Sequence, residues 1–132
     1  MSKNTDSLPM RFQALERLSL LMDRISIENL ILRIQSPNMS SGDLHGALLI
    51  AIQQEFDHNV SQQIYVSDNL WQIVLHTRKH VRDFIQVTAS TVPPNAEGKT
   101  LIEALFKGQS ELKEDPVAYA QVAIRKEASI YL

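Results

Sequence analysis

Apolar residues recur at three- and four-residue steps along most of the chain, which is the spacing of one face of an α-helix. The first stripe predicts a helix over residues 8–24, with Ser7 as its N-cap. The members of this stripe are Leu8, Phe12, Leu15, Leu18 and Met22. A second helix, IENLILRI, is predicted after Ser26, and it must end before Pro37 because the proline ring disfavours helical geometry in its predecessor.

The most apolar run of the chain, ALLIAI, lies in a third predicted helix that begins after Ser40, which forms a capping arrangement with Asp43. Apolar residues cover nearly the whole circumference of this helix, as expected for an element in the middle of a fold. The segment NVSQQIYV loses helical spacing and is predicted to be a connector. Ser67 then caps a long helix over residues 68–89. The core stripe of this helix is Leu70, Trp71, Val74, Val81 and Ile85.

Two prolines and a glycine in STVPPNAEG break the helical pattern. A short helix, TLIEALFK, follows, and Gly108 is expected to end it in a left-handed conformation. The last helix has Asp115 as its cap and Pro116 in its first turn. The predicted fold is therefore all-α: a compact bundle of five to six helices, two or three of them short. Residues 1–7 are predicted to be a disordered tail, and residues 8–132 a single helical domain.

Composition narrows the class of protein. Hydrophobic residues make up 44% and charged residues 21%, which is the balance of a soluble globular domain. The net charge of −2 gives no reason to expect a nucleic-acid partner. The longest apolar run has six residues, far fewer than the ~20 of a membrane-spanning helix. We therefore expect a cytoplasmic protein that does not associate with membranes itself and reaches the inner face of a membrane only through a partner.

The absence of cysteine excludes disulfides and thiolate chemistry, so any metal must be bound by histidine and carboxylate side chains. In the stretch EFDHN, Glu55 and His58 continue the apolar stripe of the third helix and are expected to point inward. Glu-x-x-His is the spacing used in di-metal helical bundles, but those need two such motifs, and this chain has one. The alternative hypothesis is therefore a metal-binding bundle that uses Glu55 and His58, completed in a homodimer.

The favoured interpretation is a structural polar network, because a buried carboxylate without a partner is costly. Arg11 and Arg78 each interrupt the apolar side of their own helix, and a guanidinium matches a carboxylate in shape and charge. We expect a network that fixes how the helices cross. Its members are Arg11, Glu55, His58, Asn59 and Arg78. No residue is predicted to be catalytic, and no cofactor is predicted.

Two further motifs are weaker. His76 and His80 are four residues apart, a spacing that can place two imidazoles on one metal, with Asp83 near them. All three lie opposite the core stripe, so a solvated face is the favoured interpretation. EGKT at residues 97–100 resembles the end of a phosphate-binding loop, but Pro93 stands where that motif requires glycine, and no strand precedes it. That motif is rejected.

Three blocks of the chain resemble a known family: LPMRFQALERLSLLMDRIS, ENLILRI and EFDHNVSQQIYVSDNLW. Similar blocks occur in the same order in a family of bacterial helical domains of uncharacterised function, and the resemblance covers about residues 8–90. It implies a helical domain and supplies no activity. Members of that family often carry an N-terminal membrane-spanning segment, which the short polar stretch at residues 1–7 does not provide.

Together these observations favour a non-enzymatic helical domain that acts in protein interaction or as a scaffold. A small α-domain without a cofactor motif or an assembled catalytic constellation more often presents a face to a partner than performs chemistry. A protein partner is expected. A second copy of the chain is one candidate, because ASIYL at the last residues and the long helix are apolar and aromatic.

Overall fold

The computed structural model describes residues 7–132, and the predicted disordered tail over residues 1–7 lies outside this part of the chain except for Ser7. Residues 7–132 contain six α-helices and one 3₁₀ helix, and no strand. The α-helices are α2 (Leu8–Arg24), α3 (Ile27–Ile34), α4 (Ser41–Asp57), α5 (Asp68–Ala89), α6 (Gly98–Glu111) and α7 (Pro116–Ile130), and the 3₁₀ helix is η1 (Val60–Tyr65).

The all-α class is confirmed, but the predicted count of five to six helices is too low. The additional element is η1, which forms where NVSQQIYV was expected to be a connector. A 3₁₀ helix has about three residues per turn, so the four-residue spacing that reveals an α-helix does not reveal it.

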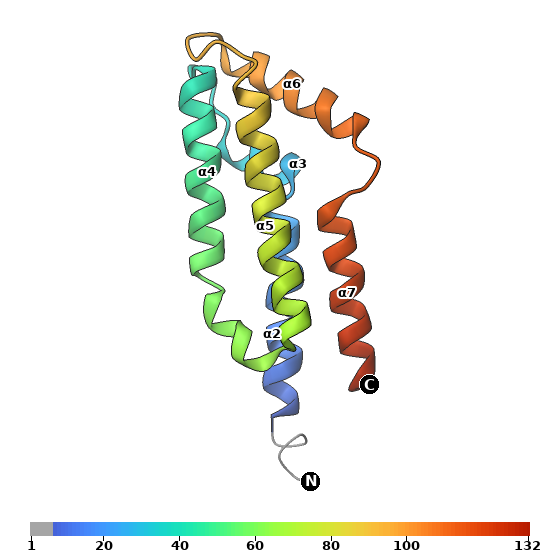
Figure 1. Cartoon of the computed structure of the whole chain (residues 1–132). Coiled ribbons are helices and arrows are strands. Elements are labelled where there is room, and N and C mark those ends of the chain that lie inside the picture. The colour runs from blue at the N-terminus through green and yellow to red at the C-terminus, as the bar shows by residue number, and fades with distance from the viewer. Residues whose placement is uncertain (1–6) are drawn as a thin grey trace.

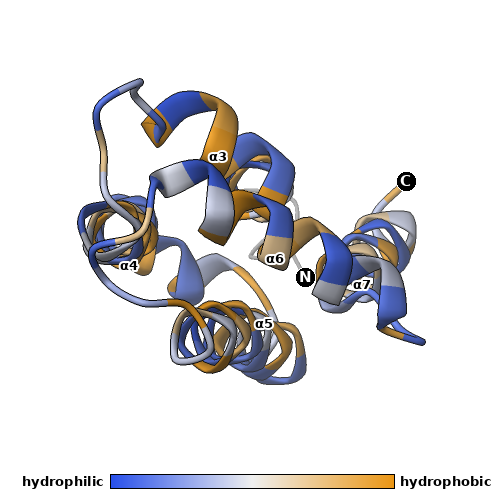
Figure 2. Cartoon of the chain, turned by 90° about the horizontal axis from the view of Figure 1, so that it is seen from above, coloured by the Kyte–Doolittle hydropathy of each residue, from blue (hydrophilic) through white to orange (hydrophobic). Residues whose placement is uncertain are grey.

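Four α-helices run along the length of the molecule, and two shorter ones lie across its end. Figure 1 shows α2, α4, α5 and α7 along the bundle, with α2 displaced so that it extends beyond the lower end of α4. Seen from above in Figure 2, α3 and α6 lie across the end of the bundle. α7 packs against α2 and α5, whereas α4 packs against α3, α5 and α6. α7, near the C-terminus, therefore covers α2, near the N-terminus.

The predicted core stripes are mostly buried, although Leu8 and Phe12 at the start of the α2 stripe are only half-buried. All five predicted core residues of α5 lie in the interior, together with Leu44, Leu48 and Ala51 of α4. Phe56 was not in the predicted stripe, yet it is buried, and its ring centroid lies 5.5 Å from that of Trp71. Burial of one such side chain is worth roughly 1.5–3 kcal/mol, so this core is the main source of stability.

Three predicted helix caps are confirmed. The Ser40 hydroxyl accepts a hydrogen bond from the Asp43 backbone N–H at 3.0 Å, and the Ser67 hydroxyl accepts one from Leu70 at 3.1 Å. The Asp115 carboxylate accepts bonds from two N–H groups in the first turn of α7. Each bond satisfies a donor that the helix itself leaves unpaired. Ser7 and Ser26 also occupy N-cap positions, but their side chains form no capping bond.

Gly108 does not end its helix, and that prediction is wrong. α6 continues through it to Glu111, and its φ is not positive. A Cβ at this position would lie 3.1 Å from the Phe84 ring of α5. The glycine therefore lets α6 approach α5 closely, and the missing side chain matters for packing rather than for backbone conformation.

The loop between α5 and α6 is held against the start of α4. An isolated β-bridge joins Ser40 to Glu97, and the Ser41 hydroxyl donates to the Glu97 carbonyl at 2.8 Å. Backbone bonds run from Ser41 N to Ala96 O (2.8 Å), from Gly42 N to Pro94 O (2.9 Å) and from Gly98 N to Met39 O (2.9 Å). The loop carbonyls thus satisfy N–H groups in the first turn of α4, which have no partner inside their own helix.

Candidate functional site

Glu55 lies near the end of α4 at a point where three helices meet. Its side chain is only 13% exposed and accepts a hydrogen bond from Nε of Arg24, at the end of α2. Nη2 of Arg33, on α3, lies 3.8 Å from the same carboxylate oxygen and donates to the Arg24 carbonyl at 3.0 Å. Burial lowers the pKa of Arg33 and the neighbouring Arg24 adds to this, whereas Glu55 raises it. One carboxylate therefore joins α2, α3 and α4.

Asn59 lies beside Glu55 and attaches the end of α4 to α2. Its Nδ2 donates to the Glu55 backbone carbonyl at 2.8 Å, while its Oδ1 accepts from Nε of Arg17 at 3.2 Å. Arg17 also donates from Nη2 to the His58 backbone carbonyl at 2.8 Å. The His58 side chain itself is exposed, contrary to the expectation that it points inward. The regular helix ends at Asp57, so the stripe of α4 cannot be extended to position 58.

Arg11 and Arg78 lie elsewhere and do not contact Glu55. Nη1 of Arg11 donates to the Tyr131 hydroxyl at 2.9 Å, and its guanidinium lies 5.3 Å from the centroid of that ring. The guanidinium of Arg78 lies 4.0 Å from the centroid of the Phe56 ring, a cation–π arrangement. The structure therefore brings together Glu55 and Asn59 from the predicted network, and it distributes the others over separate places.

The reason is the stagger between helices. A helical wheel identifies the side of a helix that faces the core, but not how far one helix is displaced along another. Because α2 is shifted along the bundle (Figure 1), its last residue, Arg24, lies beside Glu55, whereas Arg11 lies near the end of α7.

The surroundings of Glu55 do not fit a metal ion. Two guanidinium groups face the carboxylate, so a cation placed there would be repelled, and His58 is exposed. Over residues 7–132, no group of three or more histidine or carboxylate side chains could hold a metal. His76, His80 and Asp83 are exposed on α5, as expected. The hydrogen bond from Lys79 Nζ, at 2.6 Å, lowers the pKa of Asp83 most, and the charges of Lys79, Arg82 and His80 add to this.

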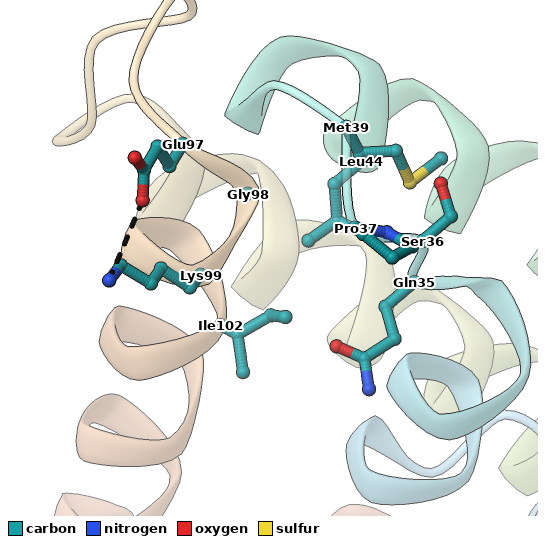
Figure 3. Close-up of a pocket in the computed structure, with 9 residues that line it drawn as sticks. All are labelled: Gln35, Ser36, Pro37, Met39, Leu44, Glu97, Gly98, Lys99 and Ile102. Carbon is teal, nitrogen blue, oxygen red and sulfur yellow. Dashed lines mark ion pairs between the residues drawn. The ribbon is translucent and has the colours of Figure 1, made fainter.

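A first hollow, of about 320 Å³, separates the α3–α4 loop from the start of α6. Figure 3 shows Gln35, Ser36 and Met39 on one side of it and Lys99 and Ile102 on the other. Lys99 pairs with Glu97 at 3.6 Å. The EGKT motif begins α6 here, but the Gly98 N–H is already bonded to Met39, so it is not free for a phosphate.

A second hollow, the α5–α7 groove, has a volume of about 290 Å³. Its walls are Asn69, Leu70 and Ile73 of α5 and Tyr119, Val122, Ala123, Lys126, Glu127 and Ile130 of α7. Tyr119, Val122 and Ile130 are 67%, 40% and 73% exposed. The inward side of α7 is formed by Val117, Ala120 and Ile124, which are buried. The signal that was missed is a second helical series on the same helix, at positions 119, 122, 126 and 130.

A third hollow, the linker cleft, is the largest of these three, at about 600 Å³. It lies where the start of α3, the middle of α5, the end of α6 and the start of α7 meet. The residues that line it come from four separate stretches of the chain, so no local sequence pattern could have revealed it.

None of the helices in residues 7–132 is long and apolar enough to cross a membrane. Comparisons with curated proteins and with solved structures yield no match. A family of proteins of unknown function matches residues 1–131. This agrees with the resemblance to an uncharacterised family. The chain therefore belongs to the family of unknown function DUF7935.

Proposed function

We propose that this domain is a non-enzymatic interaction module whose α5–α7 groove receives one amphipathic helix of a protein partner. The observation that carries this proposal is the outward stripe of α7. Tyr119, Val122 and Ile130 are large apolar side chains on one side of the helix, and all three line the groove while remaining exposed. Insertion of an apolar helix face into such a groove is a common mode of peptide recognition.

Hydrogen bonds fix α7, one wall of the groove, to α5 and α2. The Glu127 carboxylate accepts hydrogen bonds from both the backbone N–H and the hydroxyl of Ser67, at the start of α5. Gln121 donates to the Asp23 carboxylate of α2. These bonds attach α7 to both of its neighbours, so little ordering of the groove is needed when a partner binds, and less binding free energy is lost to that ordering.

Size and charge define the partner segment. α7 has 15 residues, so a helix lying along it would span about 22 Å, or roughly four turns. The Glu127 carboxylate accepts hydrogen bonds from Ser67, whereas the side-chain ammonium group of Lys126 forms no hydrogen bond or ion pair within residues 7–132. The partner helix should therefore carry an acidic residue beside its apolar stripe, facing Lys126.

A site-specific crosslinking experiment tests this proposal. A photo-reactive phenylalanine analogue replaces Tyr119 in one variant and Gln54 in the other, and both are expressed in the cells that naturally contain the protein. Gln54 is exposed on α4, which does not line the groove. We expect a discrete crosslinked protein from position 119 and none from position 54. Crosslinks of equal yield at both positions would contradict the proposal.

The binding segment is then titrated into the purified domain. Val122→Glu should weaken binding by about tenfold or more, because a charge would be buried against an apolar helix face. Gln54→Glu should leave the affinity unchanged. A crosslink from position 119 to a second copy of this chain would show that the groove forms a homodimer interface, and the proposed foreign partner would be wrong. An affinity that is insensitive to Val122→Glu would exclude the groove as the binding surface.

A further inference from the structure

The linker cleft has an apolar floor. Ile27, Val81 and Val117 come from three different helices and are buried beneath it, and the Phe84 ring is partly exposed to it. Leu112 stands at its edge, 48% exposed. The volume of about 600 Å³ lies within the range of roughly 300–1,000 Å³ that is typical of small-molecule sites. The cleft is therefore large enough for an organic ligand with an apolar body.

The rim of the cleft carries polar side chains that have no hydrogen-bond or ion-pair partner in the described part of the chain. Glu28 stands on the α3 side, His80 on α5, and Gln109, Lys113 and Glu114 on the side of α6 and the linker. In residues 7–132 none of these five side chains forms a hydrogen bond with another group or an ion pair. An apolar floor with a few free polar groups around it is the usual composition of a ligand site.

The charge around the cleft is negative. Glu28, Glu114 and Asp115 are acidic, and Lys113 is the one lysine or arginine among the residues that line it. Two helix N-termini also meet the cleft, each equivalent to about half a positive charge. An acidic residue already matches each of them: Glu28 in the first turn of α3 and Asp115 as the cap of α7. The partial positive charges of these two N-termini are smaller than the combined negative charge of the three carboxylates, so the cleft stays negative.

The end of α6 adds to this negative charge. The C-terminus of a helix carries a partial negative charge, which lysine or arginine in the last turn commonly offsets. α6 has no basic residue in its last turn, and that turn borders the cleft through Gln109. The Phe84 ring lines the cleft, and aromatic rings attract ammonium groups. The carboxylates, the C-terminus of α6 and the aromatic ring therefore favour a cation, and they outweigh the two helix N-termini that Glu28 and Asp115 already match.

We propose that the linker cleft is a binding site for a small amphipathic amine, with its apolar body on the floor and its ammonium group between Glu28 and Glu114. This site is separate from the α5–α7 groove and does not depend on the function proposed for that groove. The recognised chemistry is one positive charge attached to an aromatic or branched aliphatic body.

Titrations followed by amide NMR spectra of the uniformly ¹⁵N-labelled chain test this assignment. The probe is phenethylamine, and the matched ligands are 3-phenylpropionate as the anion and 2-phenylethanol as the neutral compound. We expect saturable amide shifts at Val81, Phe84, residues 112–115 and Val117 with the amine, and binding of the anion that is weaker by about tenfold or more. Shifts that do not saturate, that centre on another surface, or that are equal for amine and anion overturn the proposal.

Variants separate the charge from the floor. Glu28→Gln with Glu114→Gln should remove most of the preference for the amine over the anion, while Glu103→Gln, an exposed change on α6 outside the cleft, should not. Asp115 is left intact because it caps α7. A double variant that is folded by its amide spectrum and keeps the full preference for the amine would overturn the charge assignment.

One further ligand distinguishes a small molecule from a protein segment. N-acetyl-Phe-Lys-amide carries the same aromatic and cationic groups on a peptide. If it binds at the same amides about tenfold tighter than phenethylamine, the occupant is a basic segment of a protein, and the small-molecule assignment is wrong. Binding that is equal to or weaker than that of the amine supports the proposal.

Discussion

At the scale of single residues, the half-buried carboxylate of Glu55 joins three helices. It faces two arginines from two other helices, and its neighbour Asn59 is held by a third arginine, Arg17. Removing one member of a fully buried ion pair costs ~3–5 kcal/mol. Arg24 is 44% exposed and Arg33 29%, so solvent screening reduces this cost, and a smaller loss is expected.

Glu55→Ala should lower the free energy of unfolding by ~1–2 kcal/mol and the melting temperature by about 3–8 °C. The physical reason is that Arg24 and Arg33 would then face each other without the carboxylate between them. Thermal unfolding followed by circular dichroism, in metal-free buffer, measures the change. Glu103→Ala is the matched control, because Glu103 is exposed on α6.

A double-mutant cycle with Arg24→Ala separates the ion pair from the loss of side-chain packing. If the effects of Glu55→Ala and Arg24→Ala are simply additive, the pair contributes nothing, and the role assigned to Glu55 as the joint between helices is wrong.

At the scale of elements, two glycines show how closely the helices and loops approach one another. Gly98 begins α6 directly beneath the α3–α4 loop, and a Cβ there would lie 2.9 Å from the Met39 carbonyl oxygen. Gly46, within α4, has no atom within 4 Å of the position of a Cβ. Both glycines are helical and neither has a positive φ, so substitution by alanine tests space rather than backbone strain.

Gly46→Ala and Gly98→Ala should therefore shift stability in opposite directions. Alanine at position 46 gains helix propensity in open space and should raise the free energy of unfolding by about 0.5–1 kcal/mol. Alanine at position 98 must displace a backbone carbonyl and weaken its bond with the Gly98 N–H, so stability should fall by ~1–3 kcal/mol. Urea unfolding of both variants provides the measurement. A stabilising Gly98→Ala would refute the close contact between loop and helix.

At the scale of the whole molecule, α7 closes the fold onto its beginning. Tyr131 receives a hydrogen bond from Arg11, lies under its guanidinium, and packs edge-to-face against Phe12 with ring centroids 6.3 Å apart. α7 is also attached to α5, because Glu127 accepts hydrogen bonds from Ser67 at the start of that helix. These contacts join segments from both halves of the chain, so α7 should unfold together with the bundle and not alone.

Tyr131→Phe should lower the free energy of unfolding by ~0.5–1.5 kcal/mol, because it removes the hydrogen bond with Arg11 and keeps both ring contacts. Amide hydrogen exchange, measured residue by residue, should then be faster in the last turns of α7 and unchanged in α4. Identical exchange in the variant and the parent protein would mean that this bond does not hold α7 in place.

Most of the fold could be predicted because its helices bury regular apolar stripes between clear caps. The predicted bounds of residues 8–24, 27–34 and 68–89 coincide with α2, α3 and α5. The position of Gly108 could not be interpreted from sequence, since the contact with Phe84 exists only after α6 has packed on α5. The partners of Glu55 depend on the stagger of α2, and the linker cleft depends on four elements meeting. The role of Gly108, the partners of Glu55 and the linker cleft all depend on how the helices pack together, which the spacing of residues within one helix does not indicate.

The pairing of α2 with α7 also bears on how the protein is made. Arg11 and Tyr131 are 120 residues apart, which corresponds to roughly ten seconds of translation at ~5–20 residues per second. During that interval the apolar side of α2 has left the ribosome without its final cover. A nascent chain stalled before residue 116 should therefore bind holdase chaperones, and release should coincide with the emergence of the last helix.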